Sequence, residues 1–425
     1  RINIQLNEDI AELDEVVVIG YGTQKKKLVT GATAQVEGEK LAEKNSLNPL
    51  QAMQGQAAGI NITSKSGQPG EGMKVTIRGL GTIGDASPLY IVDGVQTGSI
   101  DYLNPADIES IDVLKDAASA AIYGSRAANG VVLVTTKKGE AGESRVSFDA
   151  YYGVQNKPKD IDLLNAREYA IIMNEQHLNS GGSPSNMPFE VDNLPAYTNK
   201  GAANTDWIDE MIVKNAVTQN YNLGAQGGNE QTVYSMSLSY TGQEGIVGGS
   251  DFSNYERYSG RFNSENNLYN GRLKIGEHLT YTYVNKNGIS VGNQYANTLR
   301  GAFNTSPILP MYNSEGDFLN TADNEIEDQF GNTYWNDTES NPYASMVYNN
   351  NSNTSEQRVI GDVYAELEII KNLKLKSSFG IDYFNDDYRS YTPIYKLSIY
   401  SFQNYDIVNQ DMSKNLAMNL DNTLR

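Results

Sequence analysis

Apolar and polar side chains alternate at every second residue in many segments of this 425-residue chain, and this alternation limits the folds that the chain can adopt. In the segment VYSMSLSY, Tyr234, Met236, Leu238 and Tyr240 fall on one face of an extended strand and serines fall on the other. About eight segments after residue 144 repeat this pattern, which is typical of half-buried β-strands. Ten residues of strand rise about 33 Å, or about 23 Å when tilted, which matches the apolar band of an outer-membrane barrel.

Periodicity alone fits a water-soluble β-sandwich or propeller equally well. Two features favour a barrel. The polar faces carry Ser, Asn, Lys and Asp, and residues 288–355 form a long connection with little pattern. Long loops on one side and short turns on the other are typical of outer-membrane barrels. We therefore predict a transmembrane antiparallel β-barrel over 144–425, with a small helix near residues 165–179 inside one loop.

Composition and motif spacing exclude several other classes of protein. A net charge of -19 disfavours nucleic acid as a partner, and the absence of cysteine excludes disulfides and thiolate metal sites. His177 and His278 lie far apart, so we interpret them as polar surface or wall residues rather than metal ligands. The acidic segment 322–332 lacks EF-hand spacing and is interpreted as a solvated loop. No Ser-His-Asp order or general-acid pair stands out, so we predict no enzyme activity, no cofactor and no metal.

Residues 31–139 have a different residue pattern, with short strands and short helices that indicate a compact mixed α+β unit. MKVTIRG, LYIVDGV and GVVLVTTKKG are predicted strands, and Asp116 and Gly124 are placed to cap and to end a short helix. Gly79, Gly81 and Gly84 form a G-x-G-x-x-G pattern. It does not lie between a strand and a helix, so we interpret the glycines as turn residues rather than a nucleotide site.

A series of ordered motifs, from Asp14 to about residue 270, resembles the SusC-type branch of TonB-dependent outer-membrane transporters found in Bacteroidetes. The motifs are LDEVVVIGYGTQKK, LNPLQAMQGQAAGINITSKSGQPG, VTIRGLGTI, PLYIVDGV, LNPADIESIDVLKDAASAAIYGSRAANGVVLVTTKKG and QEGIVGGSDFSNYERYSGRFN. Beyond residue 270 the chain shows only the alternating pattern of barrel strands.

The resemblance implies a division of the chain into four parts. Residues 1–12 correspond to the end of a carboxypeptidase-regulatory-like β-sandwich, 13–30 to the Ton box and linker, 31–143 to the plug, and 144–425 to the first part of a barrel of about 22 strands. Both ends of the chain fall in alternating runs, so we expect a fragment. A partial barrel would leave costly open edges in lipid.

The stretch DEVVVIGYG lies where the family has its Ton box, the segment handed to the periplasmic protein TonB by strand addition. Strand addition needs an extended segment of high β-propensity, and Gly20 and Gly22 loosen its join to the plug. Without the family context, the same stretch is predicted to be an ordinary buried strand. The predicted TonB-binding residues are Asp14, Glu15, Val16, Val17, Val18 and Ile19.

Two plug arginines, Arg78 and Arg126, match arginines that in this family pair with carboxylates of the barrel wall and hold the plug shut. The alternative is a solvated loop arginine. Trp207 and Trp335, with many tyrosines, are expected either to stack on sugars or to lie in the aromatic belts of the membrane interface. The sequence does not separate these two roles.

The resemblance implies active import of a nutrient, foremost an oligosaccharide or glycan, across the outer membrane of a Gram-negative bacterium. TonB would supply the energy, a SusD-like surface lipoprotein would cover the barrel, and outer-membrane lipid would surround it. Import of a peptide or another nutrient by the same mechanism is an alternative. A passive porin or an adhesion barrel is a third reading, but it predicts neither plug nor Ton box. Substrate-contacting residues are not predicted.

Overall fold

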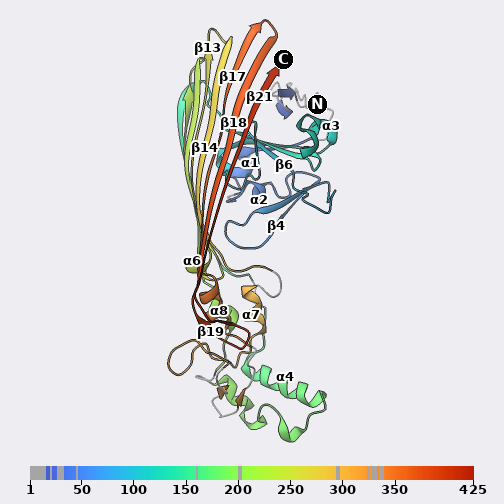
Figure 1. Cartoon of the computed structure of the whole chain (residues 1–425), viewed down its shortest axis with the longest axis vertical. Coiled ribbons are helices and arrows are strands. Elements are labelled where there is room, and N and C mark those ends of the chain that lie inside the picture. The colour runs from blue at the N-terminus through green and yellow to red at the C-terminus, as the bar shows by residue number, and fades with distance from the viewer. Residues whose placement is uncertain are drawn as a thin grey trace, which may run out of the picture.

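The computed structural model describes residues 16–19, 22–25, 33–44, 46–158, 161–199, 203–292, 297–322, 326–327, 333–334 and 339–425. These residues form a large curved sheet, a smaller mixed unit against one face of that sheet, and a cluster of loops and helices at one of its ends (Figure 1). The expected β-sandwich end at residues 1–12 lies outside the described part of the chain.

The large sheet, called the wall below, has eight strands in the order β10-β11-β12-β13-β14-β17-β18-β21, and each neighbouring pair is antiparallel. The count agrees with the alternating segments of the sequence. The strands are β10 (Gly142–Gln155), β11 (Ala216–Gly228), β12 (Thr232–Glu244), β13 (Asn254–Leu268), β14 (Leu273–Asn287), β17 (Ser352–Ile370), β18 (Leu373–Thr392) and β21 (Ile407–Leu424).

Connections between the wall strands are short at one end and long at the other. Residues 229–231, 269–272 and 371–372 make the short turns. In the second of these turns Tyr269, Asn270 and Gly271 all have positive φ, which lets three successive residues reverse the strand. The long connections at the opposite end are 156–215, 245–253, 288–351 and 393–406. The asymmetry predicted from the sequence is therefore confirmed.

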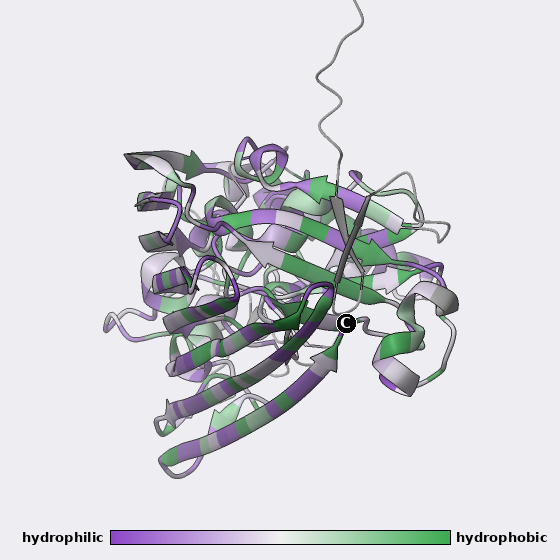
Figure 2. Ribbon diagram, turned by 90° about the horizontal axis from the view of Figure 1, so that it is seen from above, coloured by the Kyte–Doolittle hydropathy of each residue, from purple (hydrophilic) through white to green (hydrophobic). Residues whose placement is uncertain are grey.

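The two faces of the wall differ in polarity as the alternation predicts. On β12, Ser237 is 4% exposed and faces the mixed unit, whereas its neighbour Leu238 is 64% exposed on the opposite face. Bands of alternating hydropathy run along the neighbouring strands (Figure 2). In the part of the chain that the structure describes, no helix is both long enough and apolar enough to cross a bilayer.

The mixed unit comprises residues 33–138 and is called the plug unit below. Its five-stranded sheet has the order β3-β8-β9-β6-β7, in which β6 and β9 are parallel and the other pairs are antiparallel. Its strands are β3 (Thr33–Glu37), β6 (Leu89–Val92), β7 (Val95–Thr97), β8 (Ile108–Leu114) and β9 (Val131–Thr136), with a separate hairpin of β4 (Ile60–Ser64) and β5 (Met73–Ile77).

Short helices α1 (Gly38–Ala42), α2 (Pro49–Met53) and α3 (Ala117–Ala120) accompany this sheet. Asp116 caps α3 as predicted, since its Oδ1 accepts a hydrogen bond of 2.8 Å from the backbone N–H of Ser119. Gly124, with φ of 67°, interrupts the helical path that follows. The core lies between the sheet and the helices, where Ile108, Ile111 and Val113 are fully buried. Together with the antiparallel wall, this unit confirms the predicted fold class, a mixed α+β plug followed by part of an antiparallel β-barrel.

The long connections pack against one another as a loop cluster with a core of its own. The helix predicted near 165–179 is α4 (Ala166–Asn179), which begins with a capping box of Asn165 and Glu168. Further helices are α5 (Trp207–Met211), α6 (Gly249–Phe252), α7 (Thr298–Asn304) and α8 (Pro342–Asn349). The loop cluster also contains four two-residue strands: β15 (Ile326–Glu327), β16 (Thr333–Tyr334), β19 (Tyr395–Lys396) and β20 (Phe402–Gln403).

Trp207 corrects one expectation. It is buried in the core of the loop cluster, and its indole N–H donates to the carbonyl of Ser306 at 2.9 Å. A side chain placed there packs the loops together and reaches neither a sugar nor the lipid interface. Trp335 lies outside the described residues.

Candidate functional site: the contact between plug unit and wall

Strand β13 carries a row of buried polar side chains that face the plug unit. Arg257 is 1% exposed, and its guanidinium donates to the backbone carbonyls of Asp101 at 2.8 Å and Leu47 at 3.2 Å. It also donates to Oγ1 of Thr241 on β12 at 3.2 Å. A buried cation needs such partners, because removing a charge from water is costly. The plug backbone therefore supplies two of the acceptors of this wall arginine.

Two further β13 residues continue this row towards the short-turn end. Arg261 donates to the carbonyl of Lys137 at 2.7 Å and forms an ion pair of 3.5 Å with Asp107. Asn263 donates to Oγ1 of Thr136 at 2.8 Å and to the same Lys137 carbonyl at 3.0 Å. Several of these acceptors are backbone oxygens, so the attachment depends on the position of the plug backbone as well as on its side chains.

A second attachment joins strand β7 to the opposite part of the wall. Arg358 on β17 makes a two-pronged ion pair with Asp382 on β18, at 2.9 and 2.5 Å. The same guanidinium donates to Oγ1 of Thr97 on β7 and lies 4.5 Å from the ring centroid of Tyr102. Burial raises the pKa of the Tyr102 hydroxyl, so this group remains neutral beside the arginine.

The two arginines predicted from the sequence lie elsewhere. Arg78 is exposed at the end of β5 with a positive φ of 56°. Arg126 is also exposed, and it donates to Oε1 of Gln96 at 2.9 Å within the plug unit itself. Among the described residues, neither has a contact with a wall carboxylate, so their role in holding the plug stays a prediction. The signal that sequence reasoning passed over is a charged residue on the polar face of an alternating strand, as in NYERYSGRFN.

The predicted TonB-binding segment forms a strand. Val16–Ile19 is β1, and it pairs antiparallel with β2 (Gly22–Lys25) in a register from Val16 opposite Lys25 to Ile19 opposite Gly22. Asp14 and Glu15 lie outside the described residues. The extended conformation that strand addition needs is present. Binding of TonB by these residues remains a prediction.

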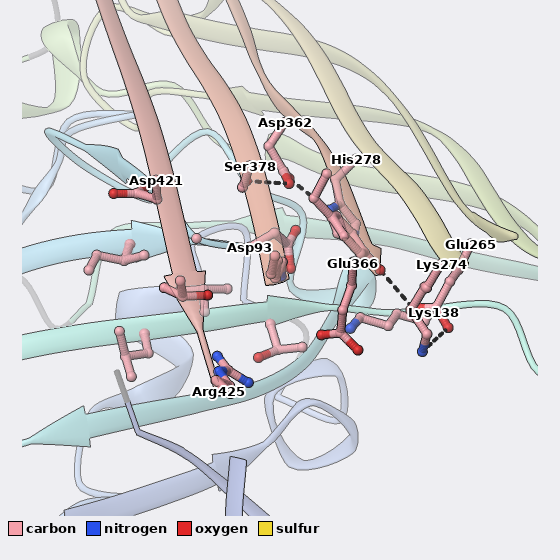
Figure 3. Close-up of a pocket in the computed structure, with 18 of the residues that line it drawn as sticks. Asp93, Lys138, Glu265, Lys274, His278, Asp362, Glu366, Ser378, Asp421 and Arg425 are labelled. Atoms are coloured by element: carbon pink, nitrogen blue, oxygen red, sulfur yellow. Dashed lines mark hydrogen bonds and ion pairs between the residues drawn. The ribbon is translucent and has the colours of Figure 1, made fainter. Parts of the chain in front are cut away.

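A charged cavity of about 360 Å³ separates the plug unit from the wall near the short-turn end (Figure 3). Asp93 and Lys138 line it from the plug side. On the wall side, His278 contacts Asp362 at 2.7 Å, so the prediction of a polar wall histidine fits. Lys274 pairs with Glu265 at 2.7 Å. Among the described residues, no group of His, Asp or Glu side chains has the arrangement of a metal site.

Smaller cavities lie between plug unit and wall towards the long loops. One of about 230 Å³ is lined by Asp101, Tyr102, Lys286 and Glu356, the last two forming an ion pair of 2.5 Å. Burial raises the pKa of the Asp101 carboxyl, and a hydrogen bond of 2.7 Å from the Asn48 amide partly opposes that shift.

A neighbouring cavity of about 300 Å³ continues towards the loop cluster. Its lining is rich in amide and hydroxyl groups, which come from Gln68, Asn287, Asn349, Asn350, Ser352 and Tyr388. Such groups both donate and accept hydrogen bonds, so they suit a polar ligand of either hydrogen-bonding sense. The lining also contains the charged residues Glu71 and Lys286, and the amides of Asn287, Asn349 and Asn350 hydrogen-bond to other groups of the protein.

Comparisons with known proteins agree with this geometry. Residues 25–131 match the family described as the TonB-dependent Receptor Plug Domain. The chain is 35% identical over 403 residues to the TonB-dependent receptor P26 of Formosa agariphila, covering 92% of this chain and 37% of that protein. It is 31% identical over 448 residues to the TonB-dependent receptor SusC of Bacteroides thetaiotaomicron, covering 99% of this chain and 42% of that protein.

Solved structures show the same architecture. The RagAB peptide importer in its open-open state superposes with a TM-score of 0.76 at 28% identity, over 96% of this chain and 46% of that chain. This chain thus spans less than half the length of the relatives it matches. The plug unit, its position on the polar face of the wall and these similarities lead to one conclusion: the chain contains the plug domain of TonB-dependent receptors and, over nearly its whole length, is similar to the SusC-like receptors of the bacterial outer membrane.

Proposed function

We propose that the receptor containing this chain actively imports a nutrient across the outer membrane, with TonB pulling on the β1 strand. The observation that carries the proposal is the attachment of the plug unit. Buried wall side chains hold it through hydrogen bonds to its backbone and polar groups, as at Arg257 and Arg261. A non-covalent attachment of this kind breaks under force and reforms afterwards. The proposal requires no broken bond in the substrate, so the protein acts as a transporter rather than an enzyme.

An oligosaccharide is the substrate class that we favour. The cavity towards the long loops is lined by amides and hydroxyls, which form hydrogen bonds with sugar hydroxyls. Peptide import is the second candidate, because the RagAB structures that superpose on this chain are described as a peptide importer. Amide side chains also hydrogen-bond to peptide backbones, so both classes suit this lining.

A SusD-like lipoprotein is proposed as the partner on the outer side. The loop cluster stands at the long-loop end of the wall, and its buried core, which includes Phe189, Tyr197 and Met346, gives it a fixed shape. Long loops of outer-membrane barrels lie on the extracellular side. The cluster therefore offers an ordered surface where a lid could dock.

The experiment that tests import deletes Asp14–Ile19 from the full-length receptor and measures uptake of radiolabelled oligosaccharides by intact cells. We expect uptake to fall to the level of cells without the receptor, while the receptor still reaches the outer membrane in normal amount. The matched control replaces Val16–Ile19 by four threonines, which keep β-propensity and backbone pairing, and it should retain import. Normal uptake by the deletion variant would contradict TonB-driven import and favour a passive channel.

A competition assay separates the two substrate classes. An excess of unlabelled oligosaccharide should suppress uptake of the labelled sugar, whereas an equal excess of mixed oligopeptides should leave it unchanged. Suppression by the peptides alone, together with TonB-dependent uptake of a labelled peptide, would establish the second candidate instead.

A further inference from the structure

Cavities on the two sides of strand β7 are aligned along β17 and β18. The charged cavity of about 360 Å³ is lined by Asp362 of β17 and Ser378 of β18. A second cavity of about 250 Å³, closer to the long loops, is lined by Arg358 of β17 and Asp382 of β18. Two cavities therefore follow one another along the same two wall strands.

The plug unit shows the same order along its chain. Asp93 and Gly94 line the charged cavity, whereas Gly98 and Ser99 line the cavity closer to the long loops. Strand β7, Val95–Thr97, lies between these two pairs of residues. Thus β7 is the part of the plug unit that stands between the cavities.

Three residues make the narrow row between the cavities: Val95 of β7, Ile360 of β17 and Gly380 of β18. Val95 and Ile360 are buried in the same apolar cluster. A Cβ atom on Gly380 would meet Oδ1 of Asn419 on β21 and would lie 2.9 Å from Cγ2 of Val95, so the absence of a side chain makes room for Asn419 and lets β7 lie against the wall. The two cavities are therefore kept apart by a close apolar contact between β7 and the wall.

The plug unit is held more strongly on the other side. Arg257, Arg261 and Asn263 of β13 donate five hydrogen bonds to it, and Arg261 adds the ion pair with Asp107. On the β17–β18 side, the described contacts are the hydrogen bond from Arg358 to Thr97, its position over Tyr102 and the apolar row. The β13 side thus has three hydrogen bonds from guanidinium groups and an ion pair, against one such hydrogen bond from Arg358 on the β7 side, so a pulling force separates the β7 side first.

We propose that the plug unit stays attached to β13 during import while β7 leaves the wall, so that the substrate crosses along β17 and β18. This inference rests on the proposed import function. Separation of the narrow row joins the two cavities into one passage lined by Arg358, Asp382, Asp362 and Lys376. Alternating charges of both signs hydrate such a passage. It suits an uncharged hydroxyl-rich chain, whereas a strongly charged ligand would be held at the residues of opposite sign.

A pair of cysteines across the narrow row tests the passage in the full-length receptor. This chain contributes no cysteine, so V95C with G380C introduces a new pair at a defined place. The sulfur of V95C can occupy the γ position that lies 2.9 Å from a Cβ atom built on Gly380, a geometry that suits a disulfide once the Asn419 side chain moves aside. We expect oxidised cells to import labelled oligosaccharide at least about tenfold more slowly, because the opening motion is blocked, and a reductant to restore import.

The matched control is the pair T136C with N263C, which links the plug unit to β13 where Asn263 and Thr136 already contact each other at 2.8 Å. We expect import to stay within about twofold of the wild type once this disulfide forms, because this side does not move. If both disulfides block import while the wild type imports normally, the whole plug unit must leave the wall, which contradicts the proposed passage along β17 and β18. Import that neither disulfide blocks would also contradict this passage. A wild-type receptor without TonB-dependent import contradicts the proposed function itself.

Thiol labelling gives a second readout that needs no disulfide. S378C places a thiol in the charged cavity, and S237C places one on β12 beside Arg261. A maleimide too large for general porins is added outside cells that import the nutrient. We expect S378C to be labelled only when TonB is active, and S237C to stay unlabelled. Labelling of S237C alone would place the route on the β13 side and overturn the inference.

Discussion

The plug unit and the wall differ in the side chains that make up their buried faces. In the plug unit, Ile108, Ile111 and Val113 are buried in an apolar core, and buried polar residues such as Asp107 and Thr136 contact the wall. In the wall, Arg257 and Ser237 are buried, whereas Leu238 is among the most exposed residues. Strands buried on both faces, such as β9, therefore build a conventional apolar core in the plug unit, whereas the alternating strands of the wall build a polar inner face.

The difference shows that the surroundings of each face decide what is buried. The outer face of the wall lies in lipid, so apolar side chains there need no protein partner. The inner face touches the plug unit, whose backbone carbonyls supply the acceptors that buried arginines need. Four substitutions test whether the two regions respond differently to the loss of a buried side chain or a charge.

Ile111→Ala in the plug core should lower the free energy of unfolding of the plug unit by about 2–5 kcal/mol, because it leaves a cavity in a closed apolar core. The measurement is urea unfolding of the full-length receptor in lipid vesicles, followed by protease cleavage of the plug unit. Leu238→Ala on the lipid face is the matched control and should cost less, since lipid fills the vacated space. Equal costs for the two variants would contradict the comparison.

Leu238→Arg should lower the stability of the inserted wall by about 2–4 kcal/mol if this residue lies near the middle of the bilayer. The physical reason is the transfer of a cation from water into hydrocarbon. Urea titration of the receptor folded in vesicles measures the effect. Glu230→Arg, in a short turn outside the strands, receives the same side chain and should leave stability unchanged. A harmless Leu238→Arg would mean that this face touches water.

Arg261→Lys keeps the charge but loses the planar fork, so one of the bonds to Lys137 or Ser235 is lost. We expect the plug unit to become about 1.5–3 kcal/mol easier to release, the usual range for a hydrogen bond to a charged group. Release is followed by the urea dependence of protease cleavage. Arg389→Lys, in an exposed pair with Asp387, is the control and should change stability by less than about 1 kcal/mol.

Asp101 should give the plug unit a weak pH dependence. Its pKa is raised by burial from the ordinary value of 3.8, against the opposing effects of Asn48, Lys65 and Arg257. The folded state then binds a proton more readily than the unfolded state, so this stabilising contribution is present at low pH and lost as pH rises through the raised pKa. Asp101→Asn should flatten the dependence of unfolding on pH above 3.8. An unchanged slope would show that other groups dominate.

Local features of the fold could be predicted because short-range physics decides them. The Asp116 cap, the capping box that opens α4 and the alternation on β12 depend on residues within a few positions of one another. The attachment of the plug unit could not be predicted in this way. Arg257 and Leu47 are 210 positions apart, and an arginine on an alternating strand is equally compatible with a water-filled lumen.

The residue pattern was enough to assign the strands, their apolar faces and the turns, since a period of two places every side chain on one face. Contacts between distant segments were needed to show that Arg257 and Arg261 of the wall bind the plug unit, and that Trp207 packs inside the loop cluster. The reason is that a buried charge is stable only beside particular acceptors. Which acceptors meet it is settled when the distant segments of the chain come together.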